Sequence, residues 1–147
     1  MTSLAKFFDG NVHNKINKKI DFSDQKYKGK IIGLYFSAHW CPPCRAFTPK
    51  LVEFYKTHRK DKNFEIIYIS SDQDEQTFDD YYKEMPWLKM DFKERKKREK
   101  LLKVFKVTGI PALILFDGDT GNIICTNAIE QIQYRDKKGE NFPWKSC

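Results

Sequence analysis

The sequence predicts an α/β protein with a central mixed β-sheet flanked by helices on both faces. Short, unbroken apolar runs alternate with segments of helical periodicity, which is typical of crossover connections between parallel strands. The last two apolar runs are separated only by turn-forming residues, which predicts an antiparallel hairpin. The length of 147 residues and the 40% hydrophobic content suit one core, so we expect a single domain over residues 1–147.

The first half of the chain contains two predicted buried strands with one helix between them. Residues 31–36 form a short apolar run of β-branched and aromatic side chains, which favours a buried strand over a helix. Residues 44–58 place apolar side chains at helical spacing, and residues 64–70 again have the composition of a buried strand. Before them we expect a strand near residues 20–22 and a turn near residues 23–28.

The second half predicts two more helices and the closing hairpin. Residues 75–85 are amphipathic and end at a proline, and residues 93–105 form a helical pattern with one basic face. Residues 112–116 and 123–126 are the predicted strands of the hairpin. A short helix is expected over residues 128–136.

The chain is basic, with 27 Lys and Arg against 20 Asp and Glu and a net charge of +7. Residues 93–100 carry part of this excess and have the composition of a nucleic-acid patch. However, Glu94 and Glu99 interrupt the run, and no aromatic side chains interleave there to stack on bases. We therefore expect no nucleic-acid partner, and a surface that at most attracts acidic proteins.

The ends of the chain and its apolar runs bear on the compartment. The runs are far shorter than the roughly 20 residues that a membrane span needs, and the first residues lack the apolar core of a secretory signal. We expect a cytoplasmic protein, with the nucleus as a second location and no membrane contact. Since disulfides are rare in reducing compartments, we expect Cys125 to be an inert core residue and Cys147 a free thiol.

The most informative motif is Trp40-Cys41-Pro42-Pro43-Cys44, at the junction of a predicted strand and a predicted helix. The first amides of a helix have no intrahelical partner, and the helix dipole favours an anion there. We therefore expect the pKa of the Cys41 thiol to lie below the free value of about 8.5. Because prolines carry no N–H, the Cys44 amide is the nearest donor to the Cys41 sulfur. Cys41 is the expected nucleophile toward disulfides, and Cys44 the resolving thiol.

Two other interpretations of the cysteine pair stay open, a zinc half-site and two unrelated core residues. A structural zinc site needs a second ligand pair. The remaining candidate ligands stand singly in the sequence: Cys125, Cys147, His13, His39 and His58. We therefore expect no metal and no cofactor, and the strand–turn–helix context favours redox chemistry.

Several stretches of the chain resemble tryparedoxins and nucleoredoxins of the thioredoxin superfamily. They are residues 35–51 around the cysteine motif, residues 70–88, Gly109-Ile110-Pro111 and Phe142-Pro143-Trp144, together with the opening residues 4–7. The resemblance covers nearly the whole chain. It implies a thioredoxin-like fold and thiol–disulfide exchange.

The resemblance also implies a set of site residues around the cysteines. The Ile110–Pro111 bond is expected to be cis and to face the cysteines, with a trans bond as the alternative. Trp40 is expected to be a partly exposed apolar wall rather than a core residue, and His39 to be exposed. The residues expected to bind substrate are Trp40, Pro42, Ile110 and Pro111, and those expected to tune the site are Pro43 and Arg45. For Arg45, a solvated surface arginine is the alternative.

Three positions differ from known patterns, Tyr35 from that of thioredoxin itself and the other two from that of tryparedoxins. Tyr35 stands where thioredoxin has a buried Asp, so no carboxylate is evident to take the proton of Cys44. Ser71 stands where tryparedoxins carry Trp, and Glu130 where an Arg is common. Ser71 and Glu130 are expected on the substrate side. These two departures therefore argue against carrying over from tryparedoxins a dependence on the glutathione–spermidine conjugate.

The function expected from the motif and the resemblance is reduction of protein disulfides, with peroxidases among the substrates. A small dithiol or a reductase is the expected electron donor, and the protein is expected to be a monomer. A nucleoredoxin-like redox-sensitive binding module is the alternative. A protein oxidase or isomerase is a third option, which would need an oxidising compartment.

Overall fold

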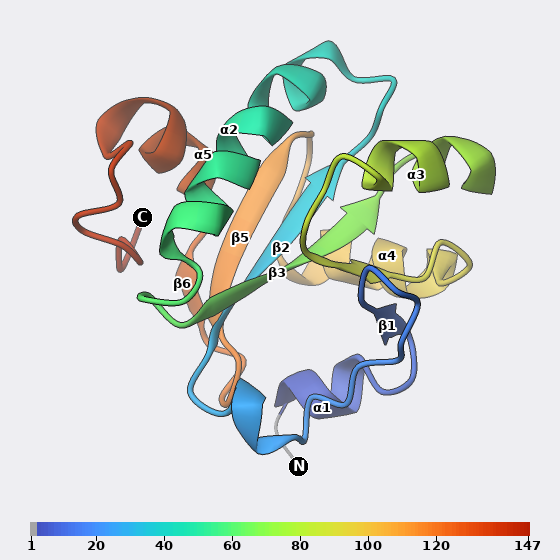
Figure 1. The fold of residues 1–147 in the computed structure, drawn as a ribbon, viewed down its shortest axis with the longest axis horizontal. Helices are drawn as coiled ribbons and strands as arrows, with labels where there is room; N and C mark the ends of the chain where they lie inside the picture. The colour runs from blue at the N-terminus through green and yellow to red at the C-terminus, as the bar shows by residue number, and fades with distance from the viewer. Residues whose placement is uncertain (1–2) are drawn as a thin grey trace.

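The computed structural model describes residues 3–147, with side chains from residue 5 onward, and contains a six-stranded sheet in the order β1-β4-β3-β2-β5-β6 (Figure 1). The strands are β1 Val12–His13, β2 Ile31–Ser37, β3 Phe64–Ser70, β4 Leu88–Met90, β5 Ala112–Asp117 and β6 Ile123–Cys125. The helices are α1 Ser3–Phe7, α2 Pro42–His58, α3 Glu75–Tyr82, α4 Arg95–Val104 and α5 Ala128–Glu130, with a 3-10 turn at Gln25–Tyr27 and a π-helical turn at Gln131–Arg135.

The sheet is mixed, as the sequence predicts. The central strands β2 and β3 are parallel and pair from Ile31 with Phe64 to Ser37 with Ser70. The hairpin strands β5 and β6 are antiparallel, and β5 is also antiparallel to β2. Because β2 and β3 end side by side, the segments that follow Ser37 and Ser70 meet at one edge of the sheet.

Helices cover both faces of the sheet, each over its own apolar cluster. Helices α2, α3 and α5 pack on one face, where Tyr35, Phe47 and Tyr81 are among the buried side chains. Helices α1 and α4 pack on the other face, with Leu34 and Leu101 in the second cluster. Neighbouring residues of β2 therefore point into opposite clusters, as the pleat of a strand requires.

The long elements agree with the prediction, and the differences lie in the short ones. Strands β1 and β4 and helix α1 were not predicted. Elements of two to five residues are too short for a hydrophobic period to be recognised in the sequence. The expected strand at residues 20–22 is wrong: only an isolated bridge between His13 and Lys19 forms there. The expected helix over residues 128–136 is divided into α5 and a π-helical turn.

The expectation that Cys125 and Cys147 are unpaired is wrong. The two sulfurs form a disulfide in the structure, with the Cα atoms 4.6 Å apart. The Cys147 carbonyl accepts a hydrogen bond from the Thr126 amide at 2.9 Å, and the Ser146 amide donates to the Ile124 carbonyl at 2.9 Å. The last residues therefore lie beside β6, a contact that sequence spacing alone does not indicate.

Among residues 3–147, none of the helices combines the length and the apolar composition that crossing a membrane requires. The longest helix among the described residues, α2, carries Lys50, Lys56 and several other polar residues along its exposed side.

Candidate active site

The end of β2 leads into α2 at one edge of the sheet (Figure 1). The two motif cysteines lie at the start of α2. Cys41 is the N-cap residue of α2, and Pro42 and Pro43 fill the first helical turn. Proline suits this position because the amide that it lacks has no partner in the first turn. The strand–turn–helix context predicted from the sequence is confirmed.

The Cys41 sulfur has the environment expected of an anion-binding helix start. It accepts a hydrogen bond from the Cys44 amide, with 3.3 Å between nitrogen and sulfur. Cys41 is 4% exposed and Cys44 is completely buried, and the two form a disulfide with Cα atoms 5.2 Å apart. Pro42 and Pro43 are exposed beside them. Cys41 is therefore the cysteine nearer to solvent.

The loop before β5 faces the cysteines. The Ile110–Pro111 bond is cis, as expected, and the Ile110 carbonyl oxygen lies 3.8 Å from the Cys41 sulfur. Both residues are partly exposed. The fold thus brings a backbone acceptor next to the redox pair from a segment 69 residues further along the chain.

Trp40 forms the exposed wall next to Cys41. Its side chain is 55% exposed, and its indole Nε1 donates to the Ser71 carbonyl at 2.9 Å. The neighbouring His39 is exposed, and its amide donates to Asp72 Oδ1 at 2.8 Å. Arg45, on the first turns of α2, is exposed as well. The loop before Cys41 is therefore held by the segment that follows β3.

Buried hydroxyl groups lie beneath Cys44, where no carboxylate was evident in the sequence. Thr48 Oγ1 donates to the Cys44 carbonyl at 2.9 Å and lies 2.7 Å from the Tyr35 hydroxyl and 2.6 Å from that of Tyr81. Burial raises the pKa of Tyr35 well above its ordinary value of 10, so this hydroxyl stays neutral. The Thr48–Tyr35–Tyr81 group fixes the first turns of α2 without adding charge.

Two residues that matter for this region were not singled out from the sequence. Asp72 is 4% exposed and accepts hydrogen bonds from Tyr68, Ser70 and the His39 amide. Arg98 of α4 donates to Ser71 Oγ. Asp72 belongs to a stretch that the resemblance covers, whereas nothing local to the basic run indicates that Arg98 reaches Ser71.

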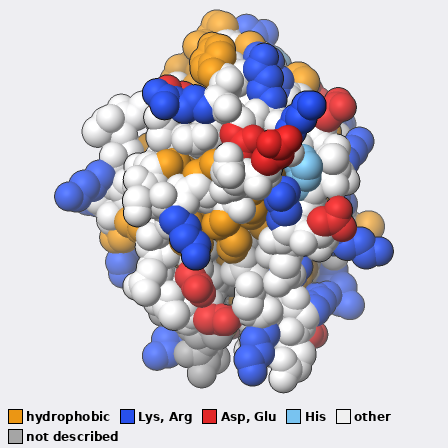
Figure 2. Space-filling model, turned by 90° about the vertical axis from the view of Figure 1, so that its left-hand side faces the viewer, with side chains coloured by type: hydrophobic (Ala, Val, Ile, Leu, Met, Phe, Trp, Pro, Cys, Tyr) orange, Lys and Arg blue, Asp and Glu red, His pale blue; other side chains and the backbone are white. Residues whose placement is uncertain are grey.

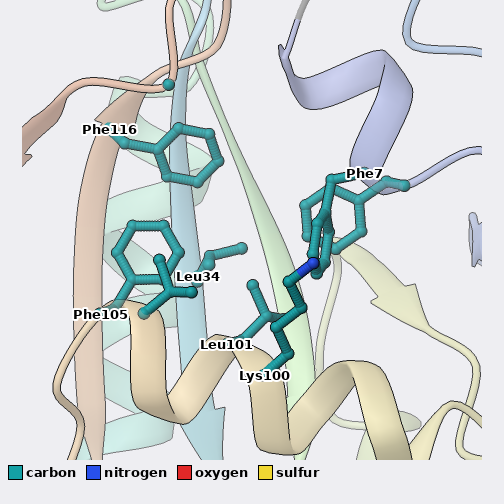
Figure 3. Close-up of a pocket in the computed structure, with 9 residues that line it drawn as sticks. Phe7, Leu34, Lys100, Leu101, Phe105 and Phe116 are labelled. Atoms are coloured by element: carbon teal, nitrogen blue, oxygen red, sulfur yellow. The ribbon is translucent and has the colours of Figure 1, made fainter.

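An apolar cavity of about 200 Å³ lies elsewhere, between α1, α4 and the sheet (Figure 3). Phe7, Leu34, Leu101 and Phe116 line it, with Lys100 at its side. None of its lining residues belongs to the cysteine motif or to the Ile110–Pro111 loop. The redox pair therefore lies outside this cavity, at the exposed edge of the sheet.

The sheet, the helix-capping cysteine and the facing cis-proline define a thiol–disulfide oxidoreductase of the thioredoxin fold. A family model described as Thioredoxin-like matches residues 29–123, and the chain belongs to this family, in its tryparedoxin and nucleoredoxin branch.

Sequence relatives agree with this assignment. Tryparedoxin of Trypanosoma brucei brucei is 47% identical over 144 residues, which cover 98% of this chain and 99% of the relative. Human nucleoredoxin is 41% identical over 118 residues, which cover 80% of this chain but only 27% of the relative. The similarity to the tryparedoxin therefore extends over both whole chains.

Solved structures agree as well. Tryparedoxin from Trypanosoma brucei superposes with a TM-score of 0.91 at 46% identity, covering 99% of both chains. Tryparedoxin II in complex with glutathionylspermidine superposes with a TM-score of 0.89 at 43% identity, covering 97% of this chain and 98% of the other. The predicted thioredoxin-like fold is confirmed.

Proposed function

We propose that the protein reduces protein disulfides, with Cys41 as nucleophile and Cys44 as resolving thiol. The observation that carries this proposal is the position of the Cys41 sulfur, which caps α2 and accepts the Cys44 amide. In the reduced protein the same amide and the helix dipole stabilise a Cys41 thiolate, the species that attacks disulfides. Cys44 is completely buried, which suits a thiol that reacts only within the protein.

The reaction proceeds by two exchanges. The Cys41 thiolate attacks one sulfur of the substrate disulfide, forms a mixed disulfide and releases the other substrate sulfur as a thiolate. Cys44 then attacks the Cys41 sulfur, and its proton passes to the second substrate thiolate as it leaves. The Cys41 thiolate and the Cys44 thiol have become one disulfide, and the substrate disulfide has become one thiolate and one thiol.

The surrounding residues supply the surface for the substrate. The Ile110 carbonyl oxygen, which lies beside Cys41 and next to Pro111, accepts a hydrogen bond from the backbone of an extended substrate. Trp40 and Pro42 provide exposed apolar contacts to the same substrate. Pro43 and Arg45 adjust the stability of the thiolate. The resemblance to tryparedoxins supports peroxidases among the protein substrates. The complex of one relative with glutathionylspermidine supports a small thiol or dithiol as the electron donor.

Insulin reduction with a dithiol as donor tests the two cysteine roles. We expect Cys41→Ser to abolish turnover, and Cys44→Ser to accumulate a mixed disulfide between Cys41 and the substrate. Cys125→Ala is the matched control, because Cys125 belongs to the other disulfide. Full activity of Cys41→Ser would refute the proposal.

A redox-sensitive binding module remains the second candidate, since several relatives are nucleoredoxins. Capture of a partner by the Cys41→Ser/Cys44→Ser double variant, at wild-type affinity, would favour this role over the enzyme. We also propose that the protein is a cytoplasmic monomer. Light scattering at micromolar concentration tests the monomer, and imaging of the tagged protein tests its location.

A further inference from the structure

The basic run of residues 93–100 lies far from the cysteines in the sequence, but two of its arginines reach the edge of the active site. Arg95 Nη1 donates to the Ser70 carbonyl at 3.0 Å. Arg98 Nε and Nη2 donate to Ser71 Oγ at 3.3 and 3.1 Å. Both serines lie where β3 ends, beside the end of β2.

Ser71 connects Arg98 to the redox motif. Its side-chain oxygen accepts from Arg98, and its carbonyl oxygen accepts from Trp40 Nε1 at 2.9 Å. Trp40 is exposed and directly precedes Cys41. Ser71 therefore contacts both the Arg98 guanidinium and Trp40, the apolar wall beside Cys41.

The Arg98 guanidinium keeps the capacity to bind an anion. It carries five N–H donors, and the contacts to Ser71 and Glu99 engage three of them. Its side chain is 20% exposed, and Glu99, its ion-pair partner, is 59% exposed. Glu99 is the solvated end of this pair, so a substrate carboxylate can compete with Glu99 for the guanidinium.

The position of Arg98 differs from that of the basic side chains on the face formed by α5 and the C-terminal segment. Figure 2 shows the face that carries α5 and the C-terminal segment, where lysine and arginine side chains stand apart with acidic ones between them. Such dispersed charges favour solubility and give no defined recognition. Arg98, in contrast, is held by two hydrogen bonds next to the site.

We propose that Arg98 determines substrate specificity by binding a carboxylate of the thiol or disulfide whose sulfur reacts at Cys41. The inference rests on the proposed redox function and adds a substrate class to it, namely sulfur compounds with a carboxylate near the reacting sulfur. The carboxylate belongs either to a small peptide thiol or to an acidic side chain of a substrate protein. An arginine fork suits either one, because it pairs with a carboxylate through two parallel hydrogen bonds.

Steady-state kinetics with two small disulfides tests the proposal. Glutathione disulfide carries carboxylates, whereas bis(2-hydroxyethyl) disulfide is neutral. We expect Arg98→Gln to raise KM for glutathione disulfide about tenfold, the loss of one charge-assisted contact. We expect kcat to be kept and the neutral disulfide to be unaffected. Lys103→Gln, which removes an exposed charge from the same helix, is the matched control and should change neither KM.

Two further arms identify the source of the carboxylate and separate this inference from the proposed function. A peptide disulfide with acidic flanking residues, compared with its amide-substituted counterpart, tests the protein source. Calorimetric binding of S-methylglutathione, which cannot react, tests Arg98 without turnover, and Arg98→Gln should weaken it about tenfold.

Defined outcomes would overturn the role of Arg98. Equal loss with the charged and neutral disulfides would show that Arg98 only positions Trp40. If Arg98→Gln leaves both KM and S-methylglutathione binding unchanged, Arg98 is a surface residue with no role in binding a carboxylate. Failure of the wild type to reduce either disulfide, with S-methylglutathione binding intact, would refute the proposed function and leave the carboxylate site standing.

Discussion

Glu65 is a buried carboxylate in β3, and its side chain accepts a hydrogen bond from Tyr55 of α2. Its Oε1 accepts hydrogen bonds from the Tyr55 hydroxyl at 2.6 Å and the Ile66 amide at 2.9 Å. The Arg59 guanidinium is 3.9 Å from Oε2 and is largely exposed, so it compensates little. Burial is the main influence, and it raises the pKa of Glu65 above its ordinary value of 4.5.

A pH dependence of stability follows from this shift. The folded state binds the Glu65 proton more tightly than the unfolded state, so this stabilisation is complete below about pH 4.5. It is lost as the pH rises through the raised pKa. Because Gln keeps an acceptor for Tyr55 and Ile66 but carries no charge, Glu65→Gln should gain stability over wild type as the pH rises from 4 to 8.

Urea unfolding across this pH range is the measurement. Glu53→Gln, on the exposed side of α2, is the control and should parallel the wild type. A constant difference between Glu65→Gln and the wild type at every pH would contradict the assigned shift.

At the scale of elements, the C-terminal segment depends on contacts with β6 and α2. The Cys125–Cys147 disulfide ties it to β6, and Phe142 and Trp144 pack against Phe54 of α2, with ring centroids 6.0 and 5.8 Å away. The Trp144 indole donates to Asp136 Oδ2 at 2.8 Å. The segment therefore packs against the C-terminal end of α2, the helix that carries the redox pair at its N-terminal end.

The disulfide is expected to stabilise this arrangement. It spans 22 residues, and a loop of that size contributes about 3 kcal/mol by restricting the unfolded chain. Cys147→Ser should therefore lower Tm by about 6–12 °C without reductant. With a dithiol present, variant and wild type should melt together.

The comparison is made in the Cys41→Ser/Cys44→Ser background, which removes the redox pair. Alkylation of denatured, unreduced protein in that background should find no reactive thiol. Two labelled cysteines before reduction, or equal melting without reductant, would show that the second disulfide does not form.

At the scale of the whole molecule, the two apolar clusters share one sheet. Tyr35 belongs to the cluster under α2, whereas Leu34 and Phe36 belong to the cluster under α4. Since β2 supplies residues to both clusters, neither can be exposed without breaking the central strand pairing. We therefore expect both faces to unfold together, in agreement with a single domain.

Calorimetry tests this cooperativity. A single transition is expected, with a calorimetric enthalpy of about 100 kcal/mol that equals the van't Hoff enthalpy. Trp fluorescence and far-UV circular dichroism should give the same midpoint. Two separated transitions would show that the faces unfold independently and would count against a single domain.

The elements that the sequence predicts well are those whose signal is local. The apolar run of β2 and the periodicity of α2 each reflect burial along one segment, and the composition of the Cys41–Cys44 motif specifies a helix start. The short strand β4 was missed because its three residues are held by neighbours rather than by their own pattern.

By itself, the sequence determined the redox pair, its place at the start of a helix, the mixed sheet and the family. The tertiary structure alone decided that Cys125 pairs with Cys147. It also decided that Arg98 and Trp40 contact the same residue, Ser71, beside the redox pair. Both pairings join segments more than 20 residues apart. Contacts of this kind depend on where β6 and α4 dock on the sheet, and no local pattern of residues encodes that docking.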